Sequence, residues 1–106
     1  MNKEFYKFKT SFIKALANPV RLMIIDCLKN GQKSVTEIIE MIKEEQSTVS
    51  KHLSILKSQG LIQDEKKGLN VYYSLKCTCI KDFFECLDNM INERIENQKE
   101  IMNRLL

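Results

Sequence analysis

The first part of the chain alternates apolar and polar residues with the period of an α-helix. One apolar stripe predicts a first helix over residues 3–17, and its members are Phe5, Phe8, Phe12 and Leu16. Asn18 and Pro19 then form the pattern of an N-cap followed by proline at the first helical position. A second helix is expected from this pair to about Lys29, where an Asn-Gly pair ends it. Its predicted buried residues are Leu22, Ile25 and Leu28.

The middle of the chain carries two shorter helical patterns joined by a short polar turn. Ser34 and Glu37 have the spacing of a capping box, which marks the start of a third helix. After the polar turn, Ser47 is expected to cap a fourth helix that ends at Gly60. The expected buried residues of the two helices are Val35, Ile38, Ile39, Ile42, Val49, Leu53 and Leu56. Two short helices with so tight a connection predict a helix-turn-helix over residues 34–59.

After Gly60 the pattern changes from helical to extended. Residues 61–65 and 71–75 predict the two strands of a β-hairpin, the wing, over residues 61–75. The residues between them, 66–70, predict a connecting loop longer than two residues.

The helical period returns for a long last segment. A helix is expected over residues 80–105, on the pattern of Phe83, Phe84, Leu87, Ile91 and Ile95. Its apolar stripe would stay exposed in a monomer, so we expect it to pair with the first helix and with a second subunit. The order of elements predicts a mainly α, winged helix-turn-helix fold with a β-hairpin wing, in a single domain over residues 1–106.

Composition narrows the class of protein. With 106 residues, 43% of them hydrophobic and 29% charged, the chain fits one small globular domain. It contains no apolar run long enough to cross a membrane and no visible secretory signal, so the cytoplasm is the expected location and no membrane partner is expected. The net charge of +3 permits a basic face for nucleic acid. His52 is the single histidine, and no set of acid, base and nucleophile accompanies it, so an enzyme is not expected.

Five blocks of sequence, taken together, are similar to one family. They are residues 15–22 (ALANPVRL), 34–38 (SVTEI), 46–53 (QSTVSKHL), 56–62 (LKSQGLI) and 71–75 (VYYSL). In this order and spacing they resemble the arsenic-repressor (ArsR/SmtB) family of winged-helix metal sensors, over roughly residues 13–92. The resemblance implies four helices, a hairpin and a fifth helix, a homodimer formed through the first and last helices, and release of DNA when an inducer binds.

The fourth predicted helix presents a polar face opposite its buried stripe. Small hydroxyls let a helix enter the major groove of duplex DNA, and serine and threonine bond either phosphates or base edges. By the resemblance, Gln46, Ser47, Thr48, Ser50 and Lys51 occupy positions that the family uses at DNA, and the helical period adds Ser54. The expected partner is a pseudo-palindromic double-stranded operator bound by a homodimer. The alternative is a polar face that is simply solvated.

The wing supplies further candidate DNA contacts. Lys66 and Lys67 suit contact with phosphate or the minor groove, and the alternative is a charged turn that protects a hairpin edge. The family often has an arginine just after the wing glycine. Here Leu69 and Asn70 follow Gly68, and Asn70 is the candidate replacement donor.

Three cysteines near the C-terminus are candidate ligands for an inducer. Thiolates at Cys77, Cys79 and Cys86 favour thiophilic ions such as As(III), Cd(II) or Pb(II), none of which is expected to be needed for folding. By the resemblance, Cys77 and Cys79 fall where some members have Asp-x-His. Seven helical residues span about 10.5 Å, so either the Cys77–Cys79 segment folds back as a loop or Cys86 comes from the other subunit.

Other interpretations of the cysteines stay open. Cysteine is a frequent core residue, and this is the favoured reading of Cys27. A repressor that responds to thiol oxidation or persulfide is the main rival to metal sensing, with oxidation expected to join Cys77 or Cys79 to Cys86. The third hypothesis is a protein-interaction module whose cysteines only pack. His52, at the edge of the apolar stripe, is expected to be a partly buried histidine bonded to a neighbour rather than a ligand.

Overall fold

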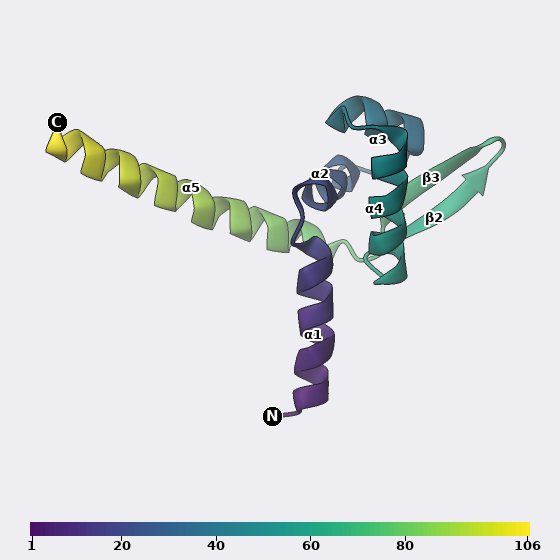
Figure 1. Ribbon diagram of the computed structural model, residues 1–106, viewed down its shortest axis with the longest axis horizontal. Coiled ribbons are helices and arrows are strands. Elements are labelled where there is room, and N and C mark those ends of the chain that lie inside the picture. The colour runs from purple at the N-terminus through teal and green to yellow at the C-terminus, as the bar shows by residue number, and fades with distance from the viewer.

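A computed structural model describes all 106 residues. The elements are α1 (Lys3–Leu16), α2 (Pro19–Leu28), β1 (Lys33–Ser34), α3 (Val35–Ile42), α4 (Gln46–Ser58), β2 (Ile62–Lys67), β3 (Asn70–Leu75) and α5 (Cys79–Leu105). They confirm the winged helix-turn-helix expected from the sequence. Figure 1 shows a compact body made by α2, α3, α4 and the β2–β3 hairpin, from which α1 and α5 extend in different directions.

Side-chain caps begin most of the helices where the sequence predicts. Asn18 accepts hydrogen bonds from the backbone N–H groups of Val20 and Arg21, and Pro19 opens α2. The capping box of α3 is complete, because Ser34 Oγ accepts from the Glu37 N–H and the Glu37 carboxylate accepts from the Ser34 N–H. Hydrogen bonding to the ionised carboxylate lowers the pKa of Glu37.

The start of α4 differs from the prediction. Ser47 is not its cap: the helix begins at Gln46, after Glu45, which makes no side-chain capping bond. The cause lies in the turn, where Lys43 adopts a left-handed conformation with φ of +56° and donates its N–H to the Ile39 carbonyl. That bend reverses the chain early, so Ser47 falls within the first turn of the helix.

The wing is part of a three-stranded antiparallel sheet with the order β1-β3-β2. Lys67 pairs with Asn70, so the loop has only two residues, Gly68 and Leu69, and the expectation of a longer loop is wrong. Gly68 has a φ of +64°, and Leu69 has a negative φ, a combination that suits a two-residue hairpin turn of type II′. β1, which sequence analysis missed, pairs with β3 and ties the wing to the helix-turn-helix.

The core lies where α2, α3 and α4 meet the base of the wing. Its fully buried large side chains are Ile24, Ile25, Leu28, Ile38, Val49, Leu53, Leu56 and Ile62. Cys27 is also buried, as predicted, and burial raises the pKa of its thiol. Leu22 is only half-buried, since Ile24 takes the inward position of α2.

The two helices that leave the body expose apolar side chains. On α1 these are Phe5, Phe8, Phe12 and Ile13, and on α5 they are Phe83, Met90, Ile91, Ile95, Ile101, Met102 and Leu105. In α5, which has 27 residues, only Phe84 is buried. Neither α5 nor any other helix combines the length and the apolar content needed to cross a membrane.

Candidate nucleic-acid interface

The helix α4 presents a polar face to solvent because its other face is locked into the core. Val49, Leu53 and Leu56 are buried and recur at helical spacing. The predicted DNA-contacting residues on the opposite side and its flanks are exposed, except for the half-buried Thr48; they are Gln46, Ser47, Ser50, Lys51 and Ser54. The hydroxyls of these residues make no hydrogen bond within the chain, and neither does the Lys51 ammonium. The helix therefore offers free donors and acceptors that can reach a duplex.

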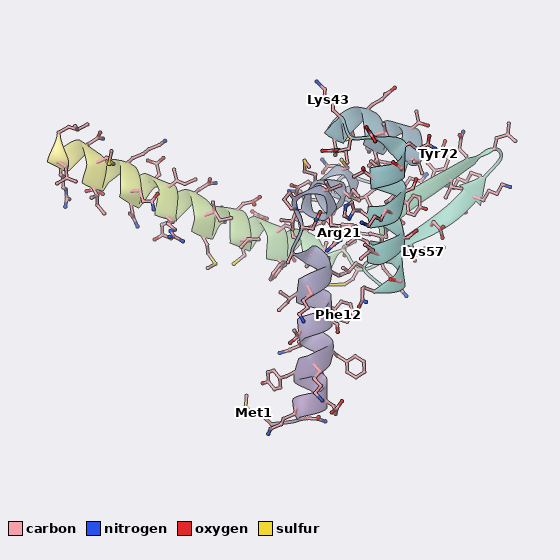
Figure 2. The ribbon with its side chains drawn as sticks, viewed as in Figure 1. Met1, Phe12, Arg21, Lys43, Lys57 and Tyr72 are labelled. Atoms are coloured by element: carbon pink, nitrogen blue, oxygen red, sulfur yellow. A yellow bond between two sulfur atoms is a disulfide. The ribbon has the colours of Figure 1, made fainter.

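One flank of α4 is tied to the wing. Lys57 on α4 donates to the Asp64 carboxylate of β2 at 2.9 Å, and this hydrogen bond raises the pKa of Lys57. Figure 2 shows Lys57 on the side of α4 that faces the hairpin. The pair links the hairpin to the recognition helix, although an exposed ion pair adds little to stability.

The other flank of α4 is tied to α1 and α2 through Arg21. Its guanidinium donates to the backbone carbonyls of Ala15 at 2.6 Å and Lys14 at 3.4 Å, and to His52 Nδ1 at 3.0 Å. His52 is nearly buried and bonded to a neighbour, which confirms the sequence interpretation. Burial, then the positive charges of Arg21 and Lys51, lower the pKa of His52, so the neutral ring accepts from Arg21. Figure 2 shows Arg21 between α4 and the junction of α1 with α2.

The wing residues differ in how free they are. The ammonium of Lys67 has partners within the chain: it donates to Gln32, just before β1, at 3.2 Å and lies 5.8 Å from the centre of the Tyr72 ring on β3. Lys66 and Asn70 are exposed and have no side-chain partner within the chain. Leu69 at the tip is 99% exposed. Lys66 and Asn70 are thus the wing side chains most available to DNA.

The structure brings together two of the three predicted cysteine ligands. Cys77 and Cys79 form a disulfide, with their Cα atoms 5.4 Å apart. The expectation that oxidation would join one of them to Cys86 is wrong for a single subunit, because Cys79 begins α5 and Cys86 lies two turns further along the same helix. The Cys77–Cys79 segment does not fold back as a loop toward Cys86. Within one chain no three histidine, cysteine or acidic side chains converge as a metal site.

Known proteins share this sequence pattern and this fold. Residues 18–64 match the family described as bacterial regulatory protein, arsR family. The transcriptional repressor SdpR of Bacillus subtilis is 38% identical over 80 residues, which are 76% of this chain and 89% of SdpR. This chain belongs to the ArsR family.

Two solved structures agree with the fold. The homodimeric winged helix-turn-helix DNA-binding domain of Mb0332 from Mycobacterium bovis has a TM-score of 0.80 at 28% identity, covering 90% of this chain and 88% of that one. Reduced HlyU from Vibrio cholerae has a TM-score of 0.75 at 31% identity, covering 83% and 93%. As an ArsR-family member the protein is a DNA-binding regulator of transcription and not an enzyme.

Sequence reasoning missed some features of this ArsR-family interface. The role of Arg21 in linking α1 and α2 to α4 was not predicted, although a charged residue among the apolar positions of the second helix was a usable signal. The Lys57–Asp64 pair depends on how α4 packs on β2, and no local pattern marks it.

Proposed function

We propose that this protein is a homodimeric repressor that reads a pseudo-palindromic operator with α4 in the major groove and the wing beside it. The observation that carries the proposal is the exposed row of unbonded hydroxyls and Lys51 on α4, held next to a hairpin whose Lys66 is free. Ser47, Thr48, Ser50 and Ser54 then contact base edges or phosphates, together with Gln46, and Lys66, Lys67 and Asn70 contact the backbone or minor groove. Such a regulator acts on DNA in the cytoplasm, the location that the sequence predicts.

The proposed dimer rests on the apolar side chains that one subunit leaves exposed. Phe8 on α1 is 67% exposed and Ile91 on α5 is 48% exposed, and both belong to stripes that run along their helices. Contiguous apolar surface of this kind is typical of a protein interface. Pairing of α1 and α5 with their counterparts sets two α4 helices about one helical turn of DNA apart, at about 34–36 Å.

We propose a thiophilic metal or metalloid, of the As(III), Cd(II) or Pb(II) type, as the inducer. Cys77 and Cys79 fit this role, since they are exposed and close enough for both sulfurs, when reduced, to bind one ion. Cys86 is exposed as well, but its place on α5 requires that it come from the second subunit. Cys77 and Cys79 would hold the ion at the start of α5, and the ion would supply soft Lewis-acid coordination there.

A second candidate inducer is an oxidant, and the Cys77–Cys79 disulfide favours it. In that reaction two thiols lose two electrons and two protons to one molecule of peroxide, which leaves as two molecules of water. The same two sulfurs serve both mechanisms, so the difference lies in the effector and in the need for Cys86.

The test measures release of a labelled duplex, selected from a randomised pool, by fluorescence anisotropy. Arsenite and cadmium are added to reduced protein, and peroxide is added in a separate series. For the metal mechanism, Cys79→Ser and Cys86→Ser bind DNA but ignore both ions, whereas the control Cys27→Ala responds as wild type does. Reversal by thioredoxin-type reduction without metal assigns the oxidant instead. Negligible affinity for every duplex at low salt would support a protein-interaction module.

A further inference from the structure

A cleft of about 280 Å³ lies between α1 and α4, away from the wing. Six residues line it: Ser11, Lys14 and Ala15 of α1, Arg21 of α2, Ile55 of α4, and Gln59, which caps the end of α4. Arg21, in the wall of the cleft, is also the residue that positions α4. Figure 2 shows Arg21 at this junction of the three helices.

The cleft carries positive charge without a counter-ion. The guanidinium of Arg21 has only neutral acceptors, two backbone carbonyls and the ring of His52. The ammonium of Lys14 has no hydrogen-bond or ion-pair partner, and neither cation belongs to any ion pair of the chain. The side-chain amide of Gln59 is also without a partner in the chain. Two uncompensated cations and a free amide donor on one concave surface are suited to an anion.

The position of the cleft relates it to the recognition helix. Ile55 follows Lys51 by one turn of α4, so the cleft borders the exposed face of that helix. Ile55 and Lys57 are two positions apart, or about 200° around the helix. Since Lys57 faces the wing, the cleft lies on the opposite flank of α4.

The cleft also avoids the surface that the proposed dimer covers. Lys14 lies two positions after Phe12, which places it about 200° around α1 from the exposed aromatic stripe. Pairing of subunits through that stripe therefore leaves Lys14 in solvent.

We propose that this cleft binds a backbone phosphate of the operator, on the flank of α4 opposite the wing. Lys14 gives the phosphate a direct positive charge, Gln59 donates a hydrogen bond, and Arg21 adds its charge from the cleft wall. The inference rests on the proposed entry of α4 into DNA, and it adds a second contact point, so that α4 is held on the duplex from both sides.

The experiment compares the salt dependence of DNA binding for Lys14→Gln and the matched control Lys7→Gln. Lys7 lies on the same face of α1, two turns away, and its ammonium is paired with Glu4. Each phosphate contact steepens log K against log salt by about 0.9, or about 1.8 for two cleft sites in a dimer. Between about 50 and about 200 mM salt, the wild type therefore loses about 12-fold more affinity than Lys14→Gln, and Lys14→Arg restores the wild-type slope.

Four further outcomes decide the matter. Lys14→Gln weakens a selected and an unrelated duplex equally, because a phosphate contact carries no sequence information. Equal slopes for Lys14→Gln and Lys7→Gln, with tight binding by wild type, overturn the phosphate site and leave the proposed function intact. The third outcome is that the salt slopes of wild type and Lys14→Gln are equal, but replacing chloride by inorganic phosphate at constant ionic strength lowers the DNA affinity of wild type and not that of Lys14→Gln. This result assigns the cleft to a free anion and overturns the backbone contact. If wild type binds no duplex at low salt, the proposed function fails and this inference with it.

Discussion

Replacing Arg21 by lysine is expected to weaken the contacts that tie α4 to α1 and α2, while the positive charge at this position is kept. Arg21 makes two close hydrogen bonds, at 2.6 Å to the Ala15 carbonyl and 3.0 Å to His52, and a longer one at 3.4 Å to the Lys14 carbonyl. Hydrogen bonds to charged groups contribute about 1.5–3 kcal/mol each. A lysine ammonium on its flexible stem lacks the planar fork that holds these acceptors together, so it loses at least one close bond.

The side chain of Arg21 is half-buried, so the lower end of that range applies. We expect the free energy of unfolding to fall by about 1.5 kcal/mol in Arg21→Lys and by about 3 kcal/mol in Arg21→Met. For a subunit of this size the first value lowers the thermal midpoint by roughly 6–12 °C. The assay is thermal and urea unfolding followed by circular dichroism, at one fixed protein concentration because the protein is expected to be dimeric.

The control is Arg94→Lys, since Arg94 is exposed on α5 and has no hydrogen-bond partner in the subunit. Equal midpoints for Arg21→Lys and wild type, or equal losses in Arg21→Lys and Arg94→Lys, would refute the role of the guanidinium fork. DNA affinity should fall with stability in Arg21→Lys, because the same three bonds hold the side of α4 that borders its recognition face.

Three other changes have expected outcomes. The free energy of unfolding should decline as pH falls below 6.5, the ordinary pKa of histidine, because the lowered pKa of His52 means that the unfolded chain takes up the proton more readily than the folded chain. Urea titrations at several pH values should show a flatter dependence of this free energy on pH for His52→Gln, and a dependence equal to that of wild type would contradict the reasoning. Phe12→Glu should raise the dimer dissociation constant by about 100-fold or more, since each of the two carboxylates buried at the interface costs at least about 1.4 kcal/mol. The control Thr10→Glu, on the opposite face of α1, should stay dimeric in light scattering. Leu69→Arg should add a cation at the wing tip and steepen the salt slope of DNA binding by about 0.9 per subunit, and a slope equal to that of wild type would place the tip away from the backbone.

The order and type of the elements could be predicted because their signals are local. Asn18 and Ser34 bond backbone groups only two or three residues away, so a short stretch of sequence contains the whole interaction. The buried stripe of α4 could be predicted for the same reason, because no charged residue lies on the buried side among Val49, Leu53 and Leu56.

The features that sequence reasoning missed depend on distant partners. β1 has two residues and exists only because Lys33 and Ser34 pair with β3. The length of the wing loop is set by cross-strand register, since Lys67 and Asn70 look like loop residues until they are paired. The cysteines show the same limit, because their spacing alone could not tell a chain that folds back from a helix that continues through Cys86.

The place of Cys77 and Cys79 explains how a small chemical change there would reach the DNA-binding face. The two residues lie between Leu75, which is buried at the end of β3, and Phe84, the one buried residue of α5. Except for the half-buried Ile80, which packs against the core, the segment between these two anchors is exposed, and it connects the wing directly to the helix expected to hold the dimer together. A bound ion or a disulfide that sets the angle of α5 would therefore change the spacing of the two recognition helices without altering either one. Coupling of about 1–3 kcal/mol is enough for such a switch, and it needs no rearrangement of the core.

Insertion of two glycines after Lys76 should on this reasoning leave operator binding by reduced protein measurable while removing its response to arsenite, cadmium and peroxide alike. An undiminished response would mean that the signal does not pass through this junction.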